Sequence, residues 1–198
     1  MKSILTKLAE EKSATDLKLL SRDSYYWIED KIRELRRTSS IPASLGKENF
    51  RQASNFKLGQ MYFFYYDPKG KSELPYYDRF PLVILLEKYP DGFLGLNLHY
   101  LPLKYRMAFM SKLVVLATFS AENEIKRIRA TYDILNATKR FKEFRPCLKR
   151  YLLPHVQSKI LQIQPNEWEI AAHLPIHHFK KASPKEVWQD SIDEIKGT

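Results

Sequence analysis

The fold is decided by residues 80–99, which read FPLVILLEKYPDGFLGLNLH. Within this stretch, residues 82–86 form a short, continuously apolar run, a pattern typical of a strand buried on both faces. The tripeptide Pro-Asp-Gly at 90–92 is a turn signal, and it predicts a tight hairpin into a second strand at 93–99. The sequence therefore predicts two strands that pair as a tight antiparallel hairpin.

An aromatic run, MYFFYY at 61–66, precedes this hairpin and has high strand propensity. The turn sequence Asp-Pro-Lys-Gly at 67–70 ends the predicted strand. Alternation along a strand sends only about half of the rings outward. Core packing is therefore the favoured role for most of them, and stacking platforms that include Tyr76 and Tyr77 are the alternative. The order strand, long loop, strand, hairpin, strand predicts a small curved antiparallel sheet or an SH3-like barrel.

Helices are expected to flank this sheet. Residues 102–117 place Leu103, Met107, Met110 and Val114 on one helical face, which should pack on the sheet. The sequence Ser-Pro-Lys-Glu at 183–186 has the form of a capping box with proline in the first turn, and it predicts a terminal helix.

An amphipathic pattern over residues 16–37 predicts one more helix, and the turn-rich residues 38–46 follow it. The predicted class is α+β with flanking helices. The predicted organisation is an N-terminal helical arm and linker at 1–56, a sheet-plus-helix body at 57–182 and a C-terminal helix at 183–198.

The composition indicates a chain that folds without disulfide bonds. With 198 residues, 44% of them hydrophobic and 13% aromatic, the chain can bury a real core, and one domain with helical additions is expected. The single cysteine, Cys147, can form no internal disulfide and fits a reducing cytoplasm. Apolar runs of five or six residues are far below the roughly 18 that a membrane helix needs, and the first residues lack the core of a signal peptide.

Positive charge is concentrated in one part of the chain. The net charge is +10, and residues 124–159 alone hold 10 basic and 3 acidic groups. Basic residues interleaved with aromatic ones can neutralise phosphates, so DNA contact is favoured over an acidic protein partner or a merely solvated face. The candidate DNA-binding residues are Lys126, Arg127, Arg129, Lys139, Arg140, Lys142, Arg145, Lys149 and Arg150.

Signals for catalysis are weak. The sequence has no phosphate-binding loop motif, no nucleophile elbow and no metalloprotease motif. Asp67, Asp78, Asp91 and His99 could be assembled into the site of a metal-dependent nuclease, although their spacing does not demand it. Pro175 interrupts the histidines at 173, 177 and 178. The expectation is a non-enzymatic protein without a catalytic residue, metal or cofactor.

Several segments, taken together, resemble a phage family: virion proteins of T4-like contractile-tailed phages, cyanophages included, known as DNA end protector proteins. The resemblance spans roughly residues 57–161, and the first 56 residues match less well. Its segments are 59–69, 74–82, 91–102, 105–106, 132–137, 144–151 and 158–161.

The resemblance implies a minor structural protein that joins the phage head at completion, holds the end of packaged double-stranded DNA and shields it from exonucleases. It further implies assembly in the host cytoplasm, a place in the virion and neighbours at the head-tail junction, with no membrane partner. Two alternatives stay open. One is a neck, connector or baseplate component that binds protein neighbours, and the other is a nuclease acting at DNA ends.

Overall fold

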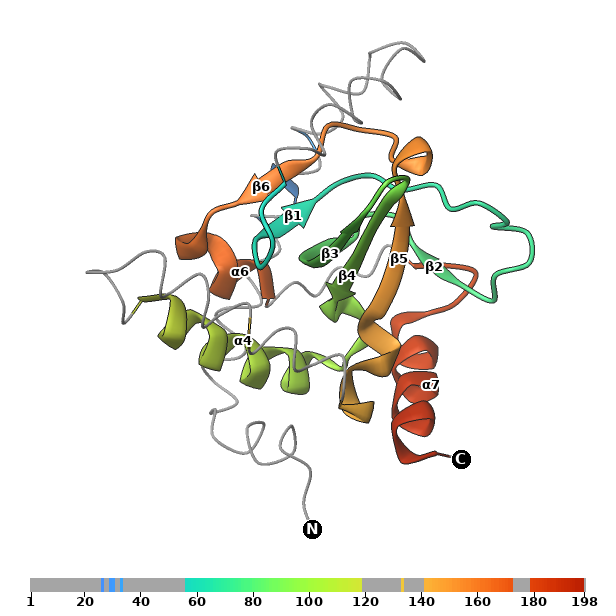
Figure 1. The fold of residues 1–198 in the computed structure, drawn as a ribbon. Helices are drawn as coiled ribbons and strands as arrows, with labels where there is room; N and C mark the ends of the chain where they lie inside the picture. The colour runs from blue at the N-terminus through green and yellow to red at the C-terminus, as the bar shows by residue number, and fades with distance from the viewer. Residues whose placement is uncertain are drawn as a thin grey trace.

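The structure is a computed structural model. Figure 1 shows in colour the residues that are described below. These are Tyr26, Glu29, Asp30, Arg33, residues 56–118, Asp133, and residues 141–172 and 179–197.

A five-stranded antiparallel sheet organises the described residues, with the strand order β5-β4-β3-β1-β6. The predicted hairpin is confirmed, because β3 pairs with β4 through the turn at Pro90 and Asp91. The strand β6 returns to the opposite side of the sheet and pairs with β1. The strands are β1 Met61–Phe63, β3 Leu82–Tyr89, β4 Gly92–Asn97, β5 Leu148–Leu152 and β6 Leu161–Ile163.

Two glycines of β4 allow its neighbours to approach closely. A Cβ atom on Gly92 would lie 1.9 Å from the carbonyl oxygen of Tyr151, and one on Gly95 would lie 1.9 Å from Cγ1 of Val83. No side chain fits at such distances. Glycine therefore occupies both positions despite its low strand propensity, because only glycine leaves room for the neighbouring strands.

The sheet buries both of its faces, as the apolar run of β3 predicted. Val83 and Leu85 pack on one side with Phe64 and Tyr151, while Ile84 and Leu86 pack on the other. Most of the aromatic run at 61–66 is buried, which confirms core packing as its main role, and only Tyr65 is half-buried.

Helices cover the Ile84 side of the sheet (Figure 1). Met110, Trp168 and Val187 bring three helices into this core: α4 Leu103–Thr118, α6 Trp168–Ala172 and α7 Pro184–Lys196. The predicted capping box at the start of α7 is present, because the Ser183 and Glu186 side chains each contact the backbone of the other. Met107 and Met110 are buried as predicted, and Leu103 is half-buried.

A two-stranded pair lies beside the main sheet. Here β2 Tyr77–Asp78 pairs with β7 Phe179–Lys180, antiparallel. Residues 67–76 form the long connection from β1 towards β2, and in Figure 1 this segment runs past β5 on the side away from β4. Four short 3-10 helices complete the described elements: η1 Leu98–Tyr100, η2 Lys142–Cys147, η3 Leu153–His155 and η4 Pro165–Glu167.

The structure confirms the α+β class and the small antiparallel sheet, and it corrects the barrel alternative. The sheet has two ends, β5 and β6, and it does not close on itself. Strand β1 ends at Phe63, three residues before the aromatic run does, and β4 ends at Asn97, because η1 takes over the two residues that were predicted as strand.

Part of the predicted organisation lies outside the described residues. Of the predicted helix at 16–37, Tyr26, Glu29, Asp30 and Arg33 are described, and all four are helical. Arg33 and Glu29 form an exposed ion pair at 4.0 Å, one helical turn apart. The linker at 38–46 lies outside the described residues, so the separate arm remains a prediction.

Candidate nucleic-acid interface

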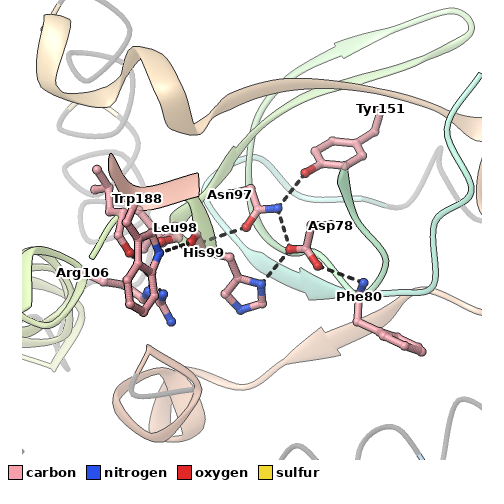
Figure 2. Close-up of polar contacts among 9 residues, drawn as sticks. Asp78, Phe80, Asn97, Leu98, His99, Arg106, Tyr151 and Trp188 are labelled. Carbon is pink, nitrogen blue, oxygen red and sulfur yellow. Dashed lines mark hydrogen bonds and ion pairs between the residues drawn. The ribbon is translucent and has the colours of Figure 1, made fainter. Parts of the chain in front are cut away.

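A buried polar network lies at the junction of β2, β4 and β5 (Figure 2). The Asp78 carboxylate accepts hydrogen bonds from the Phe80 backbone N–H at 3.0 Å and from the Asn97 side-chain amide at 2.9 Å, and its Oδ2 lies 2.7 Å from Nδ1 of His99. The same Asn97 amide donates to the Tyr151 hydroxyl at 3.0 Å. This group of residues, Asp78, Asn97, His99 and Tyr151 with the Phe80 N–H, is called the Asp78 network.

Burial and hydrogen bonding act in opposite directions on Asp78. Burial raises the pKa of its carboxyl, but His99 and the donors from Asn97 and Phe80 outweigh burial, so the net pKa is lowered. Burial also raises the pKa of the Tyr151 hydroxyl, which keeps that group neutral. The network is therefore a charged acceptor surrounded by donors, with both Asp78 and His99 side chains only 2% exposed.

A buried arginine extends this polar centre to the helices. Nε of Arg106 donates to the Leu98 carbonyl at 3.0 Å, and one terminal nitrogen donates to the Leu101 carbonyl at 3.2 Å. Burial lowers the pKa of Arg106 to about 10, so it stays charged at neutral pH. Trp188 of α7 donates to the His99 carbonyl at 2.9 Å. These contacts tie η1 to both α4 and α7.

The four residues considered for a nuclease do not form one site. Asp78 and His99 meet, but they are buried inside the Asp78 network. Asp67 instead pairs with Lys71 at 2.8 Å, and Asp91 pairs with Arg150. Among the described residues, no group of three or more histidine, cysteine, aspartate or glutamate side chains is placed to hold a metal ion. Residues 173–178, which contain the three later histidines, lie outside the described part.

A pocket of about 710 Å³ opens next to this network, between the segment 68–77 and strand β5. We call it the β5 pocket. It combines aromatic rings with three cationic side chains and two carboxylates. Its lining residues are Tyr66, Pro68, Lys69, Gly70, Glu73, Leu74, Pro75, Tyr76, Tyr77, Asp78, Tyr100, Lys149, Arg150, Tyr151 and Leu152.

Lys149 is the half-buried cation of the β5 pocket. Its ammonium lies 4.2 Å from the centre of the Tyr100 ring, a cation–π contact. Burial lowers the pKa of Lys149, while Cys147 and Glu194 act in the opposite direction. Within the described parts of the chain, no carboxylate lies within ion-pair distance of this ammonium.

Arg150, the next residue of β5, is bound differently. Its guanidinium pairs with Asp91 and stacks over the Tyr89 ring at 3.9 Å. Because successive strand residues point to opposite sides, the two cations diverge from one backbone segment. Arg150 is exposed and already has an anionic partner, so its charge is partly neutralised.

The segment opposite β5 is fixed by Lys181, whose backbone has a positive φ of 72°. Its ammonium donates to the carbonyls of Lys71, Ser72 and Leu74 at 2.6, 2.9 and 2.9 Å. Three bonds from one cation hold this wall of the β5 pocket in a single arrangement. Lys69 is exposed on the same wall.

The structure places four of the nine predicted DNA-binding residues. Lys142 and Arg145 are exposed on η2, and η2 leads directly into β5, which carries Lys149 and Arg150. The five others lie outside the described residues: Lys126, Arg127, Arg129, Lys139 and Arg140.

Sequence reasoning missed most of the β5 pocket. Lys69 and Lys181 were not singled out for binding, because each is isolated among ordinary turn residues, whereas Tyr77 was considered only as an alternative stacking platform. Strand β5 was read as part of a basic stretch, although the aromatic and apolar residues Tyr151 and Leu152 follow its two cations directly. No sequence signal could have joined residue 69 to residue 149.

The fold and this site define a basic α+β protein with exposed cations on η2 and further cations at the β5 pocket. The family described as Phage T4 terminal DNA protecting protein matches residues 3–191, and the chain belongs to this family. The match confirms the resemblance seen in the sequence and extends through the N-terminal 56 residues, where a poorer likeness was expected. No curated protein matches the chain, and no solved structure does. No helix in the described residues has the length and apolarity to cross a membrane.

Proposed function

We propose that this protein binds the ends of linear double-stranded phage DNA, shields them from exonucleases and catalyses no reaction itself. Membership of a family that protects DNA termini is the observation that carries the proposal. The geometry supports it, because exposed cations at Lys142 and Arg145 lead along η2 to Lys149 and Arg150 at the β5 pocket.

The proposed contacts are electrostatic and do not read base sequence. Lysine and arginine neutralise phosphates and release counterions, so affinity falls steeply as salt rises. A duplex end offers phosphates but no fixed sequence, and phosphate contacts position a protein without selecting bases. The remaining predicted cations, Lys126, Arg127, Arg129, Lys139 and Arg140, belong to the same proposal.

Exonuclease digestion tests this function. Linear duplex is digested at two salt concentrations with and without the protein, and a variant with Lys142, Arg145 and Arg150 changed to alanine is compared. The matched control changes Lys104, Lys185 and Lys196, three exposed lysines of α4 and α7, so that it loses the same charge elsewhere. We expect protection that weakens with salt, is reduced in the first variant and persists in the control.

A role in the assembled particle is part of the proposal. The protein would join the head at its completion and contact other virion proteins of the head-tail junction. An exposed ring at Phe141, 46% accessible, and the exposed side chain of Glu194 on α7 are available for such contacts. A neck, connector or baseplate role without DNA binding would instead give neither protection nor salt-dependent affinity for free duplex.

A further inference from the structure

The β5 pocket is too small for a double helix but suits one nucleotide. Its volume of about 710 Å³ lies within the range of about 300–1,000 Å³ that small-molecule sites occupy. A single nucleotide fits this volume, and the half-buried Lys149 is part of the lining that it would meet.

Lys149 is an incomplete electrostatic site. A half-buried ammonium needs an anionic or hydrogen-bonding partner, because burial disfavours its charge. Within the described residues its close partner is the face of the Tyr100 ring, and the carboxylate of Glu194 acts on it only at longer range. An entering anion would complete the site.

The two carboxylates of the lining do not fill that role. Asp78 directs both of its oxygens into the Asp78 network, where Phe80, Asn97 and His99 contact them. Glu73 is exposed on the segment 68–77, where solvent and salt screen its charge. The inner part of the pocket therefore presents a cation, with Lys69 as a second one on the opposite wall.

Aromatic rings also line the β5 pocket. Tyr77 is half-buried in the lining, and no other ring of the described residues packs against it. Base stacking on an aromatic ring tolerates any base, as a protein that meets DNA ends of different sequence requires. The wall that carries Tyr77 is already ordered by Lys181, so little entropy is lost when a ligand binds.

We propose that the β5 pocket receives the terminal nucleotide of a DNA strand, with Lys149 and Lys69 binding a terminal phosphate monoester and Tyr77 stacking on the base. A phosphate monoester carries a charge of about −1.5 to −2 at neutral pH, whereas an internal diester carries one negative charge. The pocket thus selects an end over internal DNA by shape and by charge. The inference rests on the proposed function and names the chemical group that this function recognises.

Binding to a DNA hairpin with a single open end tests the inference. The hairpin carries a fluorophore in its loop, and its open end has a 5′-phosphate, a 3′-phosphate or no phosphate. A covalently closed dumbbell of the same length supplies internal phosphates only. We expect the wild-type protein to favour one of the phosphorylated ends over the unphosphorylated end by about tenfold, the scale of one charge-assisted hydrogen bond, and to bind the dumbbell more weakly.

Two variants assign this preference to the pocket. Lys149→Gln should bring the ratio of affinities for phosphorylated and unphosphorylated ends close to one. The matched control is Lys142→Gln, which removes the same charge from exposed η2 and should lower both affinities while keeping their ratio. Lys69→Gln, at an exposed position, should lower the ratio about threefold and serves if Lys149→Gln does not fold.

The possible results distinguish a failure of the pocket proposal from a failure of the proposed protective function. A wild-type protein that protects linear DNA but binds phosphorylated and unphosphorylated ends equally would overturn the pocket and leave the function standing. An unchanged ratio in both Lys149→Gln and Lys69→Gln would overturn it too. A wild-type protein that gives no protection of linear DNA would instead remove the proposed function itself.

Discussion

The Asp78 network and the β5 pocket are neighbours that share Asp78 and Tyr151, yet their charges are satisfied in opposite ways. In the network, the carboxylate of Asp78 is met by donors from Phe80, Asn97 and His99. In the pocket, the ammonium of Lys149 rests on a ring without an ion-pair partner in the described chain. A fully partnered charge inside the protein stabilises the fold, whereas a half-buried charge open to a pocket is available for a ligand.

The largest loss of stability is expected when the Asp78 network loses its carboxylate. Replacing Asp78 by alanine removes the acceptor of three buried donors, of which the Asn97 amide keeps its bond to Tyr151 while the Phe80 N–H and His99 Nδ1 lose theirs. The free energy of unfolding should therefore fall by about 3–5 kcal/mol. Urea denaturation measures this. Asp67→Ala, which removes only an exposed ion pair with Lys71, is the matched control and should cost less than about 0.5 kcal/mol.

Acid should weaken the same network by a smaller amount. The pKa of Asp78 in the folded protein lies below its ordinary value of 3.8. Its contribution is therefore present above about pH 4 and is lost as the pH falls through the lower, folded-state pKa. Urea denaturation at pH 5 and pH 3 should show this loss, and Asp78→Asn, which cannot titrate, should show a flatter dependence. An equal drop in both proteins would mean that Asp78 is not the group responsible.

A smaller effect tests whether the pocket wall is preorganised. Lys181→Met removes the bonds to the carbonyls of Lys71, Ser72 and Leu74. We expect the affinity for phosphorylated DNA ends to fall about threefold, while the free energy of unfolding changes by under about 1 kcal/mol. Titration with the single-ended hairpin DNA measures the first, and denaturation measures the second. A loss of stability without any change in affinity would make Lys181 a structural residue only.

The smallest effect concerns one exposed cation outside both regions. Lys142→Gln should reduce the slope of log affinity against log salt by about 1, the value for one phosphate contact. Titrations at several salt concentrations give this slope. Lys185→Gln on α7 is the control, and a slope that falls equally in both variants would show a general charge effect instead of a contact at η2.

The features of the fold that depend on local sequence pattern could be predicted. The central hairpin follows from the apolar residues 82–86 and the turn at 90–92, and the start of α7 follows from the capping box of Ser183 and Glu186. Strand β5 was not predicted, because Lys149 and Arg150 interrupt its apolar alternation with charges that local patterning assigns to a surface.

The parts that depend on long-range pairing could not be predicted. Asp78 meets His99 and Asn97 across strands, and no spacing in the sequence specifies those contacts. Whether the sheet closes into a barrel depends on how its edge strands pair, and β6 pairs with β1 from 100 residues away. The four described cations were identified from charge alone, but only the fold separates the pocket residue Lys149 from exposed Lys142 and Arg145.

The central claim is that this protein protects DNA by binding its ends. The most direct test is exonuclease digestion of linear duplex in the presence of the purified full-length protein, followed over time at low and at high salt. We expect digestion to be blocked at low salt and the block to weaken at high salt. The triple variant of Lys142, Arg145 and Arg150 should protect the DNA less than the wild type, while the variant of Lys104, Lys185 and Lys196 should protect it as well as the wild type. Digestion that proceeds at the same rate with and without the wild-type protein would show that the protein does not protect DNA ends.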